Sequence, residues 1–306
     1  MNASKLGFAG LGMMGAPMAR RLKEAGYRLY LMDASKERQD QLQEELGAQV
    51  LDESTAAEID VLITMLPNSD IVESVLLGMN ASSGLTHSMR ANTTVIDMSS
   101  SEPMRSRSLG ATLTERGLTY LDAPVSGGVK RAISGELAIL VGGEESVLTA
   151  HHHVLSHLGG KILHIGTAGA GHAAKALNNY VSAAGLVATV EALRIAERFG
   201  IEPAVMTDVL NASTGRSNTS ENKVGNFMLS GSYDSGFALQ LMVKDLNIAK
   251  SLAGDVKYPM VFGNACCHIW EEAARHATPS TDHTEMYRLL AANDEDGATH
   301  HSGESR

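Results

Sequence analysis

The chain has 306 residues, 43% of them hydrophobic and 20% charged, a balance typical of a globular protein of about two domains. Its formal net charge is −10 and it has no block of lysine and arginine, which argues against a nucleic-acid partner. Met1 to Ser4 lead almost directly into a predicted strand, and no secretory or membrane-spanning segment is recognisable, so we expect no membrane association.

Short β-type runs alternate with amphipathic stretches through the first half of the chain. Strands are predicted at 6–9, 28–32, 61–65, 94–97, 119–121, 138–141 and 162–165, and the first two helices at 15–25 and 35–45. This alternation is typical of an α/β fold with a parallel, doubly wound sheet and helices on both faces.

The pattern changes at Gly166, after which only helical periods are recognisable. Residues 169–199 predict one helix of about 30 residues, roughly 45 Å long, whose largely apolar middle indicates burial by a partner domain or a second subunit. Further helices are predicted at 203–211, 237–252 and 259–274, which makes 167–292 an all-helical domain. The polar tail 293–306 is predicted to be disordered.

Two clusters of metal-ligand residue types have simpler interpretations. His151, His152 and His153 lie in an amphipathic stretch and are interpreted as a solvated helix face, with metal binding as the alternative. The adjacent Cys266 and Cys267 lie in a predicted helix and are interpreted as small buried hydrophobic residues. We therefore expect no metal, and the cysteine usage favours a reducing cytoplasm.

A glycine-rich motif follows the first strand and opens the first helix. Its residues are Gly10-Leu11-Gly12-Met13-Met14-Gly15. In a G-x-G-x-x-G the glycines permit a tight turn and a close backbone approach, and the helix N-terminus offers N–H groups to a pyrophosphate. The alternative is a glycine-rich turn without a ligand. We predict that residues 1–166 form a dinucleotide-binding Rossmann domain with this motif at the cofactor.

Asp33 ends the second strand, 18 residues after Gly15. An acidic residue at this point hydrogen-bonds the adenosine ribose and repels a 2′-phosphate, which favours NAD over NADP. Lys36 and Arg38 follow closely and partly offset that repulsion. The other role open to Asp33 is capping of the next helix, for which Ser35 competes.

Three loops follow the ends of later strands, where open α/β sheets bind ligands. Leu66-Pro67-Asn68 and Ser99-Ser100-Ser101 are expected to line the dinucleotide crevice. The run Asp122-Ala123-Pro124-Val125-Ser126-Gly127-Gly128 exposes backbone N–H groups and a hydroxyl, a nest suited to an anion such as a carboxylate. For each loop the alternative is a plain turn or helix cap.

Lys175 is the only charged residue between Ala173 and Val190. It is either a surface lysine with its stem on apolar surface or a partly desolvated amine, and desolvation lowers a lysine pKa towards neutrality. Asn179 lies one turn later on the same helix face. A neutral lysine there can accept the proton of a substrate hydroxyl.

In these motifs the chain resembles the β-hydroxyacid dehydrogenase family, which includes 3-hydroxyisobutyrate dehydrogenases and tartronate semialdehyde reductases. The resemblance covers roughly residues 5–291 and several separated motifs in the same order. These are Gly10–Gly15, Asp122–Gly128 with Ala132 and Gly135, Gly169-x-Gly171-x-x-x-Lys175-x-x-Asn178-Asn179, and Lys244-Asp245.

The resemblance implies a Rossmann domain, a long interdomain helix and an all-helical domain through which members form dimers or tetramers. It implies an NAD(P)-dependent oxidoreductase that interconverts a small 3-hydroxy acid and its semialdehyde. The implied residue roles are Lys175 as catalytic acid/base, Ser126, Gly127 and Gly128 for the substrate carboxylate, Asn179 for the reacting end, and Leu66, Pro67, Ser100 and Lys244 at the cofactor.

Arg216 lies between predicted helices of the second domain, where the family contacts the far end of its substrate. Its guanidinium suits a second carboxylate or a sulfonate, which favours a substrate with two anionic groups. The alternative is an ion pair with Glu221 or Asp208.

Two other functions compete with this hypothesis. An NADPH-dependent reductase of glyoxylate or succinic semialdehyde is disfavoured by Asp33. A non-catalytic dinucleotide-binding module is disfavoured by the presence of Lys175, Asn179 and Ser126 together.

Overall fold

A computed structural model describes residues 4–78 and 83–290. It forms two compact units, Met1–Lys175 and Ala176–Arg306, which divide within a long helix. The prediction of a disordered tail at 293–306 falls outside the described residues.

The described part of the first unit forms a nine-stranded sheet in the order β3-β2-β1-β4-β5-β6-β8-β7, with β9 paired to β8. The strands are β1 Lys5–Ala9, β2 Arg28–Met32, β3 Gln49–Val50, β4 Val61–Thr64, β5 Thr94–Asp97, β6 Thr119–Asp122, β7 Val125–Ser126, β8 Ala138–Gly142 and β9 Lys161–Gly166. The helices are α1 Gly15–Glu24, α2 Lys36–Leu46, α3 Ser69–Leu77, α4 Pro103–Glu115, α5 Gly128–Ser134 and α6 Glu145–Leu155, with short 3-10 helices at Ala56–Glu58 and Leu85–His87.

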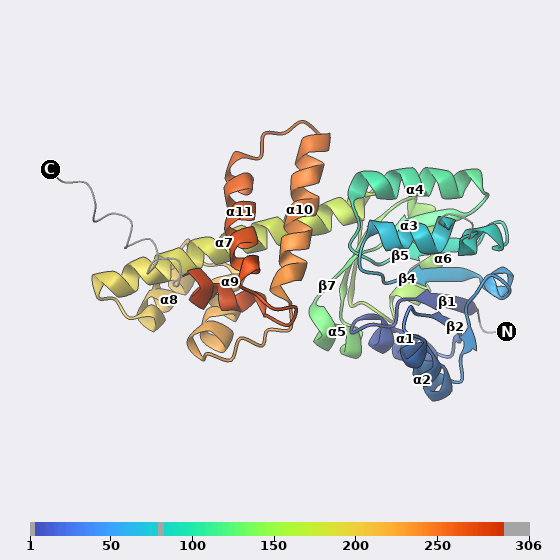
Figure 1. The fold of residues 1–306 in the computed structure, drawn as a ribbon, viewed down its shortest axis with the longest axis horizontal. Coiled ribbons are helices and arrows are strands. Elements are labelled where there is room, and N and C mark those ends of the chain that lie inside the picture. The colour runs from blue at the N-terminus through green and yellow to red at the C-terminus, as the bar shows by residue number, and fades with distance from the viewer. Residues whose placement is uncertain (1–3, 79–82, 291–306) are drawn as a thin grey trace. The chain divides into compact units, whose positions relative to one another are not determined.

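Helices cover both faces of this sheet. Leucines and a methionine of α1, α2 and α6 pack on one face, and Val72, Leu76, Leu109 and Leu113 of α3 and α4 pack on the other. Figure 1 shows α3 and α4 on the side opposite α1 and α2. All four residues of β4 are buried, because a strand covered on both faces has no solvent side.

The strand order reverses at β1, which pairs in parallel with β2 on one side and β4 on the other. Ala9, the last residue of β1, lies opposite Met32 of β2 and Thr64 of β4. The carboxyl ends of these strands therefore meet at one edge, which is the place where doubly wound sheets bind ligands.

The predicted doubly wound sheet is confirmed, but it is not parallel at one edge. Strand β8 runs antiparallel to β6 and β7, and β9 then pairs in parallel with β8. The short strands β3 and β7 were not predicted. A run of apolar residues has the same pattern in either direction, so periodicity alone does not set strand polarity.

The second unit is helical in its described part, apart from one isolated bridge between Ala238 and Asp282. Its helices are the remainder of α7 Ala170–Phe199, then α8 Pro203–Ala212, α9 Asn218–Asn222, α10 Leu239–Asp255 and α11 Val261–Arg275, with a π-helix at Val224–Leu229 and a 3-10 helix at His283–Glu285. The predictions missed α9 and the π-helix, which are short and polar or irregular in hydrogen bonding.

One face of α7 forms the centre of this unit. Ala183, Leu186, Val190 and Leu193 recur at helical spacing and are buried with the single tryptophan, Trp270. Although α7 is 30 residues long, no helix in the described part of the chain is apolar enough over a sufficient length to cross a membrane.

Candidate functional site

The glycine-rich turn lies directly after β1, at the reversal of the strand order. Gly10 has a φ of +99°, and a Cβ on Gly15 would collide with the carbonyl oxygen of Gly10. The first turn of α1 can therefore pack tightly against the end of β1 only because Gly15 lacks a side chain. Met13 is exposed in this turn, whereas Leu11 is buried beneath it. The arrangement fits a pyrophosphate at a helix N-terminus.

Asp33 connects the end of β2 to this turn. Its Oδ2 accepts the backbone N–H of Leu11 at 2.6 Å, and its Oδ1 accepts that of Ser35 at 2.8 Å. Ser35 itself caps α2, so the helix-capping role considered for Asp33 belongs to Ser35. Arg38 lies 3.4 Å from Oδ1 of Asp33. An acid and a base thus stand together at the end of β2, the position at which dinucleotide-binding folds distinguish a 2′-hydroxyl from a 2′-phosphate.

The two polar loops after β4 and β5 are joined by a hydrogen bond, from the backbone N–H of Leu66 to Ser99 Oγ at 2.9 Å. Asn68 caps α3 by accepting the N–H of Ile71 at 3.0 Å, so part of the first loop has the plain capping role. Pro67 is exposed and Ser100 is partly buried.

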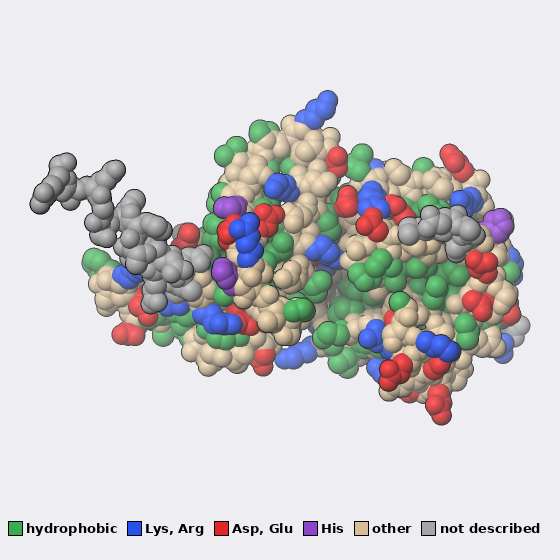
Figure 2. All heavy atoms as spheres, viewed as in Figure 1, with side chains coloured by type: hydrophobic (Ala, Val, Ile, Leu, Met, Phe, Trp, Pro, Cys, Tyr) green, Lys and Arg blue, Asp and Glu red, His purple; other side chains and the backbone are tan. Residues whose placement is uncertain are grey.

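The first unit has a hollow on the face that Figure 2 shows. Hydrophobic side chains gather in this hollow, at the place where Figure 1 draws strands β1 and β4.

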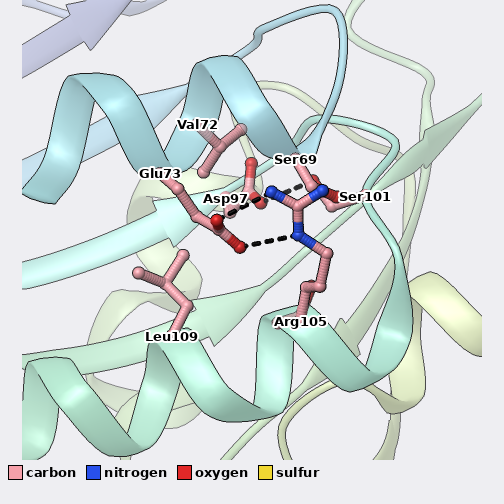
Figure 3. A pocket seen from close by; sticks show the side chains of 8 residues that line it. Ser69, Val72, Glu73, Asp97, Ser101, Arg105 and Leu109 are labelled. Atoms are coloured by element: carbon pink, nitrogen blue, oxygen red, sulfur yellow. Dashed lines mark hydrogen bonds and ion pairs between the residues drawn. The ribbon is translucent and has the colours of Figure 1, made fainter. Parts of the chain in front are cut away.

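A small hollow beside the second loop contains an arginine–carboxylate cluster that joins two helices. Arg105 on α4 donates to both carboxylate oxygens of Glu73 on α3, at 2.9 and 2.7 Å (Figure 3). These hydrogen bonds, with a further ion pair to Asp70, raise the pKa of Arg105 above its ordinary value. The cluster holds α3 and α4 together next to Ser101.

The loop predicted to hold a carboxylate runs from the end of β7 into α5. Gly127 and Gly128 have φ values of +134° and +70°, which is the left-handed region that favours glycine. Ser126 is partly buried at the strand end, and the position that a Cβ on Gly128 would occupy is open among the described residues, apart from the glycine's own chain neighbours and helix backbone. Consecutive N–H groups in such a turn suit an anion.

Lys175 reaches this loop. Its Nζ donates to the carbonyl oxygen of Val125 at 2.7 Å, next to Ser126. The lysine is partly buried and lies in the second turn of α7. The structure thus brings the predicted acid/base beside the predicted carboxylate loop, although the two are about 50 residues apart in sequence.

The first turn of α7 is anchored to the sheet by Asp122, at the end of β6. Oδ1 of this buried carboxylate accepts the N–H of Gly169 at 2.7 Å, and Oδ2 accepts that of His172 at 2.9 Å. A Cβ on Gly171 would collide with the carbonyl oxygen of Leu140, so glycine is needed for this close approach. Sequence reasoning placed Asp122 in a motif but gave it no role.

His172 adds a second attachment of α7 to the sheet. Its Nδ1 lies 2.8 Å from Ser106 Oγ, and its Nε2 lies 3.1 Å from the carbonyl oxygen of Ser99. The side chain is fully buried, with Asp97 and Asp122 each 3.8 Å away. The helix start that carries Lys175 is therefore fixed to the carboxyl ends of β5 and β6.

In the second unit, Asn179 is held by a carboxylate. Its Nδ2 donates to Oδ2 of Asp245 on α10 at 2.6 Å. Lys244 Nζ lies 3.8 Å from the other oxygen, Oδ1, which is buried. Because the amide nitrogen of Asn179 faces Asp245, the orientation of its carbonyl oxygen is also set. The motif Lys244-Asp245 was recognised in sequence, but this contact was not foreseen.

Arg216 is 63% exposed and lies 3.5 Å from Glu221, so it forms one of the two ion pairs considered for it.

Within the described residues, no three histidine, cysteine or acidic side chains form a group able to hold a metal ion. His152 and His153 are exposed on α6, as predicted, but His151 is partly buried and its Nε2 lies 2.8 Å from Thr94 Oγ1. Cys266 and Cys267 are buried, and burial raises the pKa of Cys266 to about 11.

Both units match families of known proteins. Residues 5–166 match the family described as the NAD-binding domain of 6-phosphogluconate dehydrogenase, and residues 169–290 match that described as NAD-binding of NADP-dependent 3-hydroxyisobutyrate dehydrogenase. The 2-(hydroxymethyl)glutarate dehydrogenase of Eubacterium barkeri is 38% identical over 84% of this chain and 85% of its own length. The human mitochondrial 3-hydroxyisobutyrate dehydrogenase is 34% identical over 93% and 86%.

Solved structures have the same fold. A structure of Mycobacterium tuberculosis 3-hydroxyisobutyrate dehydrogenase with L-serine has a TM-score of 0.87 and 32% identity, and covers 94% of this chain and 99% of that one. An imine reductase from Myxococcus stipitatus shares the fold alone, with a TM-score of 0.64 at 19% identity, 95% coverage of this chain and 100% of that one.

Proposed function

The chain belongs to the β-hydroxyacid dehydrogenase family, and on that premise we propose that it interconverts a small 3-hydroxy acid and its semialdehyde with Lys175 as the acid/base. The observation that carries the proposal is the position of Lys175 Nζ, 2.7 Å from the carbonyl oxygen of Val125 and beside the loop Ser126–Gly128. A substrate whose carboxylate is bound by this loop has its hydroxyl-bearing carbon within reach of the lysine.

The chain's own residues divide the work. Backbone N–H groups of Gly127 and Gly128 and the hydroxyl of Ser126 bind the carboxylate, and Asn179 binds the hydroxyl end. Neutral Lys175 accepts the hydroxyl proton during oxidation, and its ammonium returns that proton to the alkoxide during reduction. A bound nicotinamide dinucleotide supplies the hydride acceptor for the carbon that carries the hydroxyl.

The residues after β1 and β2 fit this cofactor, because Gly10–Gly15 leave the start of α1 open to a pyrophosphate. Leu66, Pro67, Ser100 and Lys244 complete its proposed contacts. NAD is the preferred dinucleotide in this proposal. Asp33 supports the preference, since its carboxylate repels a 2′-phosphate, and Arg38 at 3.4 Å weakens it.

The proposed substrate carries two anionic groups. The relative named 2-(hydroxymethyl)glutarate dehydrogenase, at 38% identity, supports a dicarboxylate. Arg216 is the residue that the sequence offers for the second anion, and its ion pair with Glu221 must open for that role.

We also propose a homodimer or homotetramer assembled through the second unit. Leu177, Val181, Ile195 and Phe199 of α7 are between 46% and 83% exposed. Apolar residues at this spacing on one long helix support burial by a second copy. Light scattering after size exclusion measures the subunit count directly. Two buried free cysteines support the proposed cytoplasmic location.

Initial rates with NAD and NADP against a panel of 3-hydroxy acids test the function. The panel contains L-serine, 3-hydroxyisobutyrate, threonate, 2-(hydroxymethyl)glutarate and 2,3-dihydroxypropanesulfonate. Lys175→Ala is expected to lower turnover about 10² to 10⁴-fold while NADH still binds. Turnover that survives this substitution contradicts the proposed mechanism, and a chain indifferent to it is a binding module.

A further inference from the structure

Lys223 is a basic side chain of the second unit that the site described so far does not use. It lies between α9 and the π-helix Val224–Leu229, whose bonding pattern is rare in proteins and occurs often at functional sites. The first hydrogen bond of the π type runs from the N–H of Met228 to the carbonyl oxygen of Lys223. The backbone is therefore irregular at Lys223.

The ammonium of Lys223 is mostly buried and has a weak partner. Its Nζ donates to Ser182 Oγ at 3.3 Å, and the described part of the chain places no carboxylate within ion-pair distance of it. Burial lowers the pKa of Lys223 to about 8, against the opposing field of Asp282. Buried lysines are almost always paired with an anion, and a single hydroxyl compensates poorly for lost hydration.

Ser182 lies on the face of α7 that carries the proposed active site. It follows Lys175 by seven residues and Asn179 by three, so all three side chains belong to one stripe of the helix. Seven residues correspond to about 10 Å along the helix axis. Lys223 therefore reaches the continuation of the stripe on which Lys175 and Asn179 lie.

Arg216 is less suited to the same task. It is 63% exposed and already has a carboxylate partner in Glu221. An exposed guanidinium in an ion pair gains little from a second anion, because water and salt screen the interaction. A partly desolvated ammonium without a carboxylate gains more.

We propose that Lys223 binds the second anionic group of the substrate and so makes the enzyme selective for dianionic 3-hydroxy acids. The proposal rests on the proposed function, because it assigns the far end of the same substrate. The ligand class is a carboxylate or sulfonate separated by a short chain from the hydroxyl-bearing carbon. Ser182 acts with Lys223 by fixing the direction of its ammonium.

The test compares Lys223→Met with the wild type, using 2-(hydroxymethyl)glutarate as the dianion and 3-hydroxyisobutyrate as the monoanion, with NAD. The ratio of kcat/KM for the dianion to that for the monoanion is expected to fall about 10- to 100-fold, chiefly through the KM of the dianion. Lys223→Arg should restore part of this ratio. Lys250→Met removes the charge of an exposed lysine on α10 and is the matched control.

Several outcomes overturn the proposal. If kcat/KM falls equally for both substrates in Lys223→Met, the role of the lysine is structural. If the ratio of kcat/KM for the dianion to that for the monoanion falls in Arg216→Gln but not in Lys223→Met, then Arg216 binds the second anion. Wild-type enzyme that prefers the monoanion, with turnover abolished by Lys175→Ala, leaves the proposed reaction and the role of Lys175 intact. It refutes both the dianionic substrate and the Lys223 subsite.

A binding measurement separates the two proposals if neither acid is turned over. Glutarate and butyrate are titrated into the wild type, Lys223→Met and Lys250→Met in the presence of NADH, and the melting temperature is followed. Stabilisation by glutarate that needs Lys223 supports the subsite even where the proposed reaction fails. Equal stabilisation of all three proteins, or none in the wild type, overturns it.

Discussion

Oδ2 of Asp122 accepts the backbone N–H of His172 at 2.9 Å, and the same histidine places its Nδ1 3.8 Å from that oxygen. The two residues join the end of β6 to the first turn of α7. Lys175 follows His172 by three residues, so the position of the proposed acid/base depends on this junction. Both side chains are fully buried.

Asp122→Ala is expected to displace Lys175 without removing it. Loss of two buried hydrogen bonds to a carboxylate costs about 2 to 4 kcal/mol of unfolding free energy. Displacement of the lysine by about 1 Å lowers kcat on the order of 100-fold. Urea denaturation and initial rates measure the two effects, while the dissociation constant for NADH should change little.

Asp282→Ala is the matched control for that variant. Asp282 in the second unit also accepts backbone N–H groups, from Gly236 at 2.9 Å and Phe237 at 3.2 Å. It is expected to lower stability to a similar extent and to leave the kcat for a monoanionic substrate within about threefold, since it supports no residue of α7 near Lys175. A parallel fall of kcat in both variants would show that Asp122 acts only through stability.

A second pair of variants tests the contact between Asp245 and Asn179. Asp245→Leu removes the acceptor of the Asn179 amide, so the amide loses its orientation and the KM for the hydroxy acid should rise about 10-fold or more. Asp245→Asn retains an amide oxygen that can accept the same bond and should stay within about threefold of the wild type. Initial rates at saturating NAD measure these KM values. Similar KM values for both variants would refute the proposal that Asp245 orients the Asn179 amide.

Asp33→Ser is expected to shift the cofactor preference towards NADP. The substitution removes the charge that repels a 2′-phosphate and releases Arg38, now 3.4 Å from the carboxylate, to bind that phosphate. We expect the ratio of kcat/KM for NADP to that for NAD to rise on the order of 100-fold. Arg38→Ala in the same chain should remove most of the gain, and a gain that persists means that Arg38 does not contact the phosphate.

Lys223→Met should stabilise the protein near neutral pH. The pKa of Lys223 is lowered to about 8 in the folded chain, against 10.5 as its ordinary value. Between these pH values the unfolded chain binds more protons, so wild-type stability rises with pH across that interval. The cost of the buried charge is therefore complete below pH 8 and absent above about pH 10.5.

The variant has no such cost, and its advantage is at most about 3 kcal/mol at pH 7. Melting temperatures of both proteins at pH 7, 9 and 10.5 measure it, and the difference should shrink as the pH rises. A variant less stable than the wild type at pH 7 would show that Lys223 contributes net stabilising contacts.

The alternation of strands and helices predicted most of the sheet, because each buried strand is a short apolar run with turn residues at its ends. The same runs have no direction, and so the antiparallel β8 was missed. The two-residue strands β3 and β7 are too short to show a period of two. The π-helix after Lys223 arises from the hydrogen-bond partners of the backbone, which residue types do not specify.

In the candidate site, too, the sequence predicts only those features that depend on residue type. Motif residues such as Gly15 and Lys175 were recognisable because their chemistry restricts the residue type. Their partners were not, since Lys175 contacts a main-chain carbonyl oxygen and Asp122 accepts main-chain N–H groups from nearly 50 residues away. Any residue type can supply such a group. The contacts of Asp122 and Asp245 are therefore visible only in the structure.

Helix α7 is continuous from Ala170 to Phe199, and its first turn is locked to the sheet. Each residue of an α-helix advances the direction of the next side chain by about 100°. Insertion of one residue between Lys175 and Asn179 would turn every later side chain to another face, whereas a seven-residue insertion nearly restores the original direction. Chimaeras that exchange the helical unit between relatives should therefore be spliced within α7 with no net change of length, and indels should be confined to the loops.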